Sequence, residues 1–334
     1  MIFRRRSKAA AITAFWTWWE AARPRAEKMI SGVPDDRLAA ELTALVSAIH
    51  PGLQWEFTTG SESTHVLVVT SGGDPALRSL AERWRRASPE PDVIFAYAAA
   101  RPGNPSALAG VLQIDGHRLA LTDARFDAIP DEATLAVHVR VWHPEFAAMT
   151  EQSRTQVAFL TLDWLLGEDA VEIWVGEIAA VSRPGPDLTG GELANVVAGM
   201  APQDGTERWG TLTGTRRGKP LVALAQVPLK PARWPGCDLH IRVDVPYRLR
   251  DENGFPAQDA FPALYALEDR ITEFADGAVV VAHETCDGVR TTHLYTDRRA
   301  AAHALEPVIA TWPDGRIRMT VSPDPRWEAV AHLR

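Results

Sequence analysis

The clearest pattern of hydrophobic and polar positions lies between residues 238 and 245. Leu239, Ile241, Val243 and Val245 alternate there with polar side chains, which is typical of a strand with one buried face. The patterns that follow predict a helix, two strands, a second helix and a last strand, at 264–274, 278–286, 289–295, 297–312 and 317–321. The order β-α-β-β-α-β predicts a ferredoxin-like domain over residues 236–334.

The first 182 residues carry further α+β patterns. Helical spacing predicts helices at 11–30 and 34–49, and the patterns after them predict β-β-α-β, at 53–57, 65–70, 77–84 and 93–98. Short strands are predicted at 110–114 and 117–121. A strand from Thr134 to Trp142, a helical region from Pro144 to Leu166 and a strand from Val171 to Val181 predict a later β-α-β unit.

Residues 183–235 read as a connector that is rich in proline and glycine. It contains a short helix near Leu193 and a hairpin of two strands, at 209–215 and 221–227. The fold class predicted for the whole chain is α+β, with two or more packed units of antiparallel or mixed sheet and helices on one face.

Composition narrows the class of protein. The chain has 334 residues, is 46% hydrophobic and 23% charged, and has a formal net charge of -8. That charge argues against nucleic acid as the partner, and no apolar run is long enough to predict a membrane span. Two cysteines fit a reducing compartment, so we expect a cytoplasmic protein. The basic start at Arg4 precedes a short apolar stretch without a signal-peptide cleavage site.

The C-terminal motifs resemble a known family. They are Asn253-Gly254-Phe-Pro256, Leu267-Glu268-Asp269, Leu294-Tyr295 and Asp324-Pro325-Arg-Trp327. This region is similar to the domain of unknown function 695, whose shape resembles that of the protein regulators of ribonuclease E. The opening Phe15-Trp16-Thr-Trp18 is similar to the N-termini of uncharacterised proteins that carry this domain. The resemblance implies a protein-binding role and carries over no catalytic residue.

The strongest metal candidate combines two pairs of residues, Cys237 with His240 and His283 with Cys286. Four such side chains are the number that zinc requires. Residues three apart in a strand point to opposite faces, however, which opposes a shared site. The alternative is a linker cysteine, an outward histidine and an ordinary small cysteine near a hairpin end. We therefore predict no metal and no cofactor.

Other polar groups give weaker signals. His138 and His143 flank a strand end without a visible partner, so we expect ordinary strand histidines. Glu168, Asp169 and Glu172 could bind a cation, but a polar turn after a helix explains them as well. The loop 214–220 differs from a phosphate-binding loop in spacing and has proline where serine or threonine is needed.

Tryptophan is the one unusual count, at twelve. The candidates for binding a partner are those at termini and linkers, namely Trp16, Trp18, Trp19, Trp209, Trp234 and Trp327. Packing between domains is the alternative role. The function predicted from the sequence is a non-enzymatic protein-binding or regulatory protein that acts through an acidic surface and tryptophan-rich seams. A metal-assisted hydrolase using the histidines and cysteines, and a structural homodimer, are the alternatives.

Overall fold

The structure is a computed structural model that describes residues 7–202, 206–275 and 277–334. Its contacts divide the chain into two compact units. The first unit comprises Met1–Ile129 and Val137–Ala198, and the second comprises Pro130–Ala136 and Gly199–Arg334. Each unit has its own core of buried hydrophobic side chains, which is the property that defines a domain.

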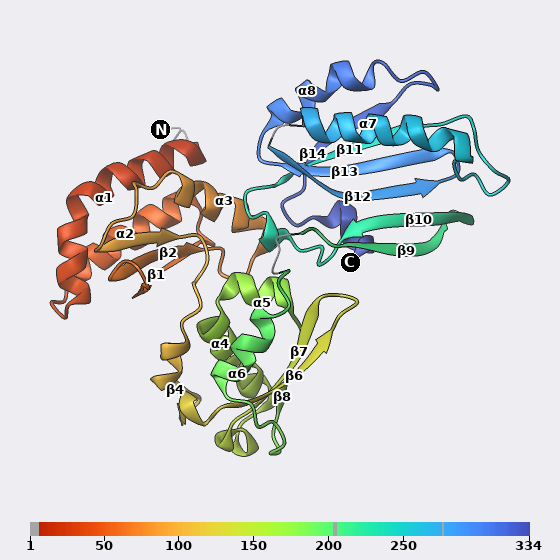
Figure 1. The fold of residues 1–334 in the computed structure, drawn as a ribbon. Helices are drawn as coiled ribbons and strands as arrows, with labels where there is room; N and C mark the ends of the chain where they lie inside the picture. Colours follow the sequence, from red (N-terminus) through yellow and green to blue (C-terminus); the bar gives the residue numbers. More distant parts are fainter. Residues whose placement is uncertain (1–6, 203–205, 276) are drawn as a thin grey trace. The chain divides into compact units, whose positions relative to one another are not determined.

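The first unit begins with two helices and a three-stranded sheet of order β1-β2-β3 (Figure 1). β1 is antiparallel to β2, and β2 is parallel to β3, to which α3 connects it. The predicted order helix-helix-β-β-α-β is confirmed, with bounds α1 (Lys8–Ile30), α2 (Asp36–Ile49), β1 (Gln54–Thr59), β2 (His65–Thr70), α3 (Pro75–Arg86) and β3 (Phe95–Ala98). Asp35 begins α2, because its side chain accepts a hydrogen bond from the amide of Leu38.

The closely spaced aromatic residues of α1 reach several neighbouring elements. Trp16 stacks on Trp84 of α3 with ring centroids 4.7 Å apart, and its Nε1 donates to the Trp84 carbonyl. Trp19 donates to the hydroxyl of Tyr97 on β3 at 2.9 Å. Trp18 is partly exposed and donates to Glu41 of α2. The helix therefore lies between α2, the sheet and α3, which explains why its aromatics do not form one narrow stripe.

The next elements form a hairpin and a second three-stranded sheet, and all of them except residues 130–136 belong to the first unit. Their bounds are β4 (Val111–Ile114), β5 (His117–Ala120), β6 (Arg125–Asp131), β7 (Ala136–Trp142), α4 (Glu151–Leu166), α5 (Glu168–Trp174), β8 (Val175–Val181) and α6 (Gly190–Ala198). β7 and β8 are parallel neighbours, as the predicted β-α-β unit requires. Strand β6 is an element that the sequence analysis missed.

One predicted strand is wrong in its first half. The range 171–181 was expected to be extended, but Val171 lies in α5 and the strand begins at Val175. Gly167, with φ of 88°, separates α4 from α5, and Glu168 and Asp169 occupy the first turn of α5. Acidic side chains in a first turn interact favourably with the helix dipole, and this favours helix over strand here.

The second unit is built on a six-stranded sheet of order β14-β11-β13-β12-β10-β9. All five neighbouring pairs are antiparallel. The bounds are β9 (Trp209–Arg216), β10 (Lys219–Gln226), β11 (Leu239–Pro246), α7 (Phe261–Phe274), β12 (Ala278–Cys286), β13 (Val289–Thr296), α8 (Arg299–Ile309) and β14 (Arg318–Pro323). The predicted order β-α-β-β-α-β is present from β11 to β14, and its assignment to the ferredoxin-like class stays a prediction.

The predicted connector, residues 183–235, contributes elements to both units. Helix α6 belongs to the first unit, and the hairpin β9–β10 extends the sheet of the second by pairing with β12. Among the described helices, none has the length and apolar character to cross a membrane.

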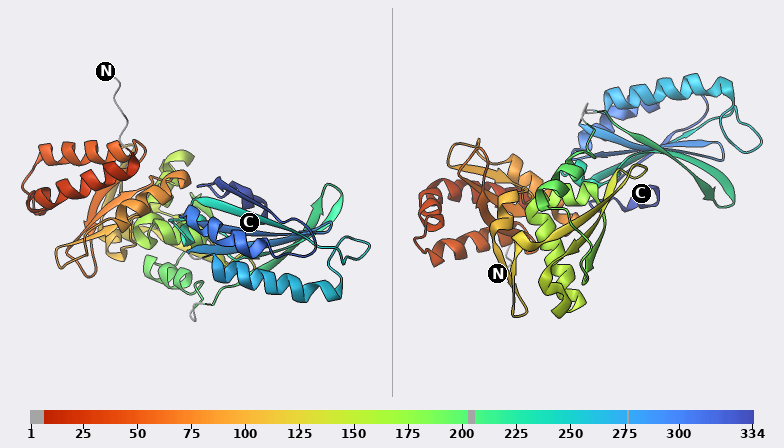
Figure 2. Two further views of the ribbon diagram at one scale, coloured as in Figure 1. Left: turned by 90° about the horizontal axis from the view of Figure 1, so that it is seen from above. Right: turned by 60° about the horizontal axis from the view of Figure 1, so that its bottom comes forward.

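The two faces of the second unit's sheet differ. Helices α7 and α8 cover one face, where Ile241, Val243 and Leu294 are buried (Figure 2). The C-terminal end lies on the other face, which we call the open face. There Trp327 packs on Tyr295 in a small apolar cluster. Polar side chains on the open face include Arg242, Asp244, Glu284 and Thr291.

Candidate functional site

Strand register places a row of polar residues on the open face. Asp244 of β11 lies opposite Thr291 of β13, which lies opposite Glu284 of β12. Two residues closer to the start of β11, Arg242 lies opposite His293 of β13 on the same face. Because side chains alternate between the faces of a sheet, the residues between these positions point toward the helices instead.

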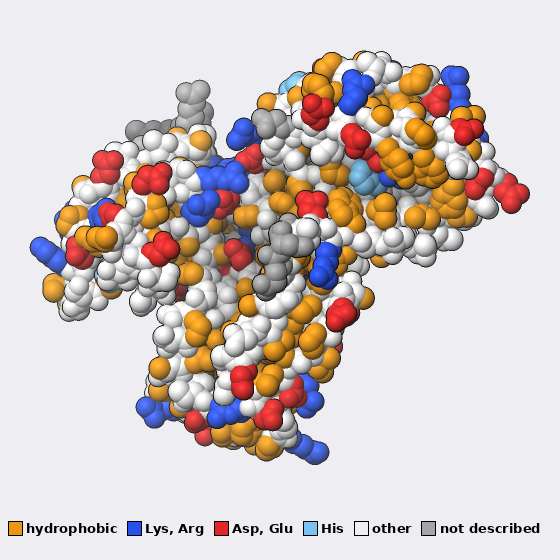
Figure 3. Space-filling view, in the orientation of Figure 1, with side chains coloured by type: hydrophobic (Ala, Val, Ile, Leu, Met, Phe, Trp, Pro, Cys, Tyr) orange, Lys and Arg blue, Asp and Glu red, His pale blue; other side chains and the backbone are white. Residues whose placement is uncertain are grey.

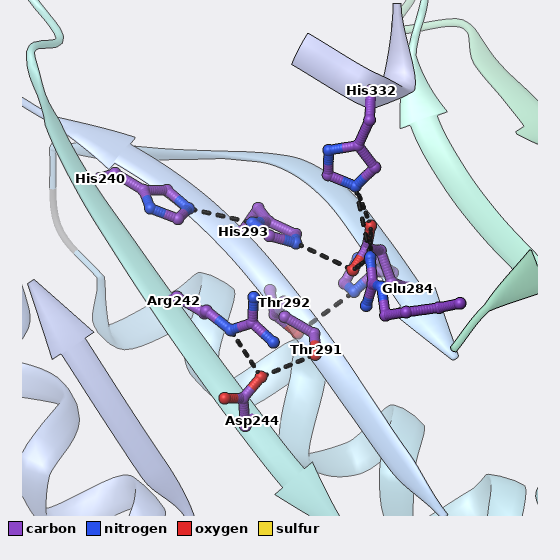
Figure 4. Close-up of polar contacts among 10 residues, drawn as sticks. His240, Arg242, Asp244, Glu284, Thr291, Thr292, His293 and His332 are labelled. Carbon is purple, nitrogen blue, oxygen red and sulfur yellow. Dashed lines mark hydrogen bonds and ion pairs between the residues drawn. The ribbon is translucent and has the colours of Figure 1, made fainter. Parts of the chain in front are cut away.

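Glu284 is the centre of a polar network on this face (Figure 4). Its side chain is 1% exposed, and Arg216 donates to both carboxylate oxygens at 2.6 Å. His332, near the end of the chain, contacts one of the same oxygens. The Nε2 of His293 lies 3.5 Å from the other oxygen. The carboxylate thus joins β9, β12, β13 and the C-terminal end.

Two histidines continue the network along the sheet (Figure 4). His240 Nε2 and His293 Nδ1 are 2.9 Å apart. A carboxylate only accepts hydrogen bonds, so we assign the proton of His293 to the Nε2 that faces Glu284. Its Nδ1 then accepts from His240. Both rings are neutral in this arrangement.

Burial sets the charge state of these groups. Burial, with His293 as a secondary cause, lowers the pKa of His240 from 6.5 to about 4. Burial also lowers the pKa of His293, although Glu284 opposes that shift. For Glu284, burial alone would raise the pKa, but His293, Arg216 and His332 together lower it far below its usual range. Glu284 is therefore ionised, and a carboxylate of such low pKa is a poor general base.

A column of stacked side chains also lies on the open face. Trp327 stacks on Tyr295 with ring centroids 3.8 Å apart, and Trp234 stacks on the far side of Trp327 at 5.5 Å. Asp324 accepts a hydrogen bond from the Tyr295 hydroxyl at 2.6 Å. Burial and Asp324 raise the pKa of Tyr295. The Asp-Pro-Arg-Trp motif thus holds the C-terminal end on the sheet.

Beside this column the open face contains a hollow of about 700 Å³. We call it the basic hollow, because six cationic side chains and only three carboxylates line it. The cations are Arg216, Arg217, Lys219, Arg242, Arg316 and Arg318. Two of the carboxylates are already paired inside the protein. Asp244 accepts from Arg242 at 2.9 Å and from Thr291 at 2.7 Å, and Glu284 accepts from Arg216.

Four of the cations are uncompensated. The side chains of Arg217, Lys219, Arg316 and Arg318 form no hydrogen bond or ion pair with the part of the chain that the structure describes. All four are exposed. On the face of the molecule that Figure 3 shows, Lys and Arg side chains lie among Asp and Glu side chains. The hollow is thus a local excess of positive charge on a chain whose net charge is -8.

The four metal candidates are not brought together. His240 lies on the open face against His293, whereas His283 lies on the helix face, where its Nδ1 is 3.0 Å from Glu268 of α7. Cys237 packs near Trp327, and Cys286 lines the basic hollow. Within the described residues, no three His, Cys, Asp or Glu side chains are grouped as a metal ion would require. The physical reason is that the two histidines project from opposite faces of one sheet.

The weaker candidates have structural partners in the first unit. His143 is buried, lies 3.0 Å from the Ala120 carbonyl and accepts from the amide of Glu145. His138 accepts from the amide of Glu177. Asp169 and Glu172 both pair with Arg78 of α3.

Glu168 is also engaged in the first unit, where it accepts hydrogen bonds from Thr70 and from the Arg101 amide. Nearby Asp163 lies in a pocket, and burial followed by the charge of Glu168 raises its pKa to about 6.

The candidate partner-binding tryptophans differ in exposure. Trp16, Trp19 and Trp327 are buried within their own units. Trp18 and Trp234 are partly buried, and Trp209 is 39% exposed at the sheet edge. The described contacts of the buried ones are with the core, and a part in partner binding stays a prediction for all six.

The sequence patterns did not predict the residues that form the basic hollow and the network beneath it. Glu284, His293 and His332 were not identified, although the alternation in β11 had placed His240, Arg242 and Asp244 on one polar side. A polar side in a strand is usually read as solvent-facing. The signal that could have found the site is the recurrence of charged residues on that side in three strands and in the turn 216–219.

Comparison with known proteins gives one match. No curated protein and no solved structure matches the chain. The resemblance predicted for the C-terminal region is confirmed by a family model, and the resemblance of the N-terminal aromatic stretch stays a prediction. The matched range includes every residue that lines the basic hollow. Over residues 207–332, the chain matches the family described as Family of unknown function (DUF695).

Proposed function

We propose that this chain is a non-enzymatic binding protein whose C-terminal unit binds an acidic segment of a partner protein in the basic hollow. The observation that carries the proposal is the set of four exposed cations without internal partners, Arg217, Lys219, Arg316 and Arg318. Carboxylates of a partner would pair with these four cations, just as Asp244 pairs with Arg242 and Glu284 pairs with Arg216 inside the protein.

The overall charge helps to identify the kind of anion. A long polyanion such as nucleic acid would extend beyond the hollow, and the rest of a chain with net charge -8 would repel it. A short acidic segment would feel mainly the nearby cations, because screening limits charge interactions to about 8 Å at physiological salt. The hollow therefore favours acidic side chains over a nucleic-acid backbone. This differs from the acidic contact surface predicted from the sequence, since a net charge does not give the distribution of charges.

Binding fits the site better than catalysis for a chemical reason. The ionisable groups on the floor of the hollow contact one another, and His293, Arg216 and His332 hold Glu284 ionised. A general base should have a pKa near the working pH, and Glu284 does not. The cations around it are suited to holding anionic groups in place.

The test is calorimetric titration of the full chain with a short polyglutamate peptide. We expect binding that weakens with added salt and falls at least about tenfold in the double variant Arg316→Glu/Arg318→Glu. The matched control is Arg298→Glu/Arg299→Glu, which makes the same charge change at the start of α8, on the helix-covered side. Unchanged affinity in the double variant would overturn the proposal. Inorganic pyrophosphate serves as a second probe, and tighter binding of it than of the peptide would mark a small-anion site instead.

A further inference from the structure

The edge strand β9 has an unusually open backbone. It is the last strand of the sheet, and within the described residues its only strand partner is β10. The pairing continues over eight residues, from Trp209 to Arg216, without a bulge. No proline or charge lies between Gly210 and Thr215. Proteins usually protect long edge strands with such features, because an open edge can pair with another strand.

The hairpin turn determines which backbone groups of β9 are open. Arg217 and Gly218 have φ of 52° and 75°, which indicates a two-residue turn of the type common in hairpins. Such a turn makes Arg216 and Lys219 a hydrogen-bonded pair, and alternate residues then pair in the same way. The hydrogen bond from the Val227 amide to the Arg208 carbonyl, at 2.8 Å, agrees with this pattern.

It follows that the odd-numbered residues of β9 direct their N–H and C=O groups away from the sheet. These residues are Trp209, Thr211, Thr213 and Thr215. Their spacing is that of the free edge of an antiparallel strand, and an incoming extended segment could pair with all of them.

Charge identifies the segment that would fit. Arg216 and Arg217 lie at the end of β9, where both line the basic hollow, whereas Glu207 offsets the charge of Arg208 before its start. An antiparallel pair of two β9 strands would bring the Glu207–Arg208 pair of one copy, which has no net charge, near these arginines of the other. An acidic segment would instead supply carboxylates at the end of β9 where the cations of the basic hollow lie. Exposed Trp209 and Leu212 add apolar contact area on the two faces of the strand.

We infer that the acidic partner segment binds by adding a strand along β9, with its acidic end in the basic hollow. This inference rests on the proposed function, since it specifies how the same partner is held. Main-chain hydrogen bonds to the odd-numbered residues would supply affinity, and the cations of the hollow would select an acidic sequence.

The test uses amide hydrogen exchange measured by NMR on the full chain. The probe is a synthetic peptide of alternating valine and threonine with glutamates at both ends. We expect the peptide to slow exchange at the amides of Thr211, Thr213 and Thr215. The amides of Leu212 and Gly214, which pair with β10, should be protected with or without it. Unchanged exchange at the odd-numbered amides in the bound state would overturn the inference.

A backbone variant separates this inference from the proposed function. Thr213→Pro removes one outward N–H and should leave the β10 pairing intact, because proline is tolerated where an edge N–H faces solvent. We expect peptide affinity to fall about tenfold in Thr213→Pro and to change little in the control Thr213→Val. Retained protection at Leu212 and Gly214 verifies that the variant is folded.

The two sets of variants give distinguishable results. Loss of binding in Arg316→Glu/Arg318→Glu but not in Thr213→Pro would leave the proposed function standing and overturn strand addition. If neither peptide binds the unmodified chain, both proposals fail. Protection of the odd-numbered amides that rises with protein concentration in the absence of peptide would show that a second copy occupies the edge, which also overturns the inference.

Discussion

At the scale of single residues, the buried imidazole of His240 should make the free energy of unfolding depend on pH. Its ring is stacked on His293 with centroids 5.2 Å apart, and the two are hydrogen bonded. Burial and the neighbouring His293 lower the pKa of His240 to about 4 from its ordinary 6.5. The folded protein therefore holds this ring neutral at pH values where the unfolded chain would protonate it.

The free energy of unfolding should decrease as the pH falls from about 6.5 to about 4. Across this range the unfolded chain binds a proton at residue 240 and the folded chain does not, so protons favour unfolding. The shift in pKa corresponds to at most about 3 kcal/mol. Urea unfolding at a series of pH values measures it, and His240→Gln should show a flatter dependence. The pKa of Glu284 is lowered in the folded protein, so its contribution to the free energy of unfolding is lost only below a pH of about 4.5. A slope unchanged by His240→Gln would contradict this assignment.

At the scale of elements, the C-terminal segment 324–333 completes the second unit. Trp327 has φ of 56°, a left-handed conformation that is unfavourable for a bulky residue. Its Nε1 donates to the Cys237 carbonyl at 2.9 Å, and its ring is fully buried on Tyr295. Asp324 also accepts from the amides of Glu328 and Ala329. These contacts hold the segment in a backbone conformation it would not adopt alone.

Trp327→Ala should therefore lower the free energy of unfolding by about 3–5 kcal/mol, the usual cost of removing a fully buried large aromatic side chain. Urea unfolding of the full chain measures the loss. Trp209→Ala is the matched control, because Trp209 is partly exposed at the sheet edge and should cost much less. Equal losses in the two variants would mean that the C-terminal segment does not stabilise the sheet.

At the scale of the whole molecule, the chain comprises two units with separate cores. The sheet of the second unit includes β9 and β10, which contribute Ala223 and Ala225 to the buried cluster on the open face. The family match begins at residue 207, just before β9. The sequence analysis had placed the start of this domain at residue 236, after both strands.

We expect a fragment of residues 199–334 to fold by itself, because it contains the six-stranded sheet, both helices and the C-terminal segment. Circular dichroism and a dispersed amide NMR spectrum would establish this. A fragment of residues 236–334 should be less stable, because it exposes the edge of β12 that pairs with β10. Greater stability in the shorter fragment would favour the boundary at residue 236.

The sequence by itself determined most of the local structure. Alternation from Leu239 to Val245 predicted β11, and the helical spacing of Leu264, Leu267 and Ile271 predicted α7, since these periods follow from strand and helix geometry. The resemblance of the C-terminal region was also readable from short motifs. Helix α5 was misread because its apolar residues suit either element, and only the acidic first turn distinguishes them.

Only the tertiary structure decided which polar side chains meet. Glu284 contacts Arg216, 68 residues earlier, and His332, 48 residues later. Those contacts depend on the order of strands in the sheet, which periodicity does not encode. The same order gathers cations from the turn 216–219 and from the start of β14 around one hollow, although the chain as a whole is acidic. Net charge is a sum over residues, whereas a binding surface depends on where the fold places them.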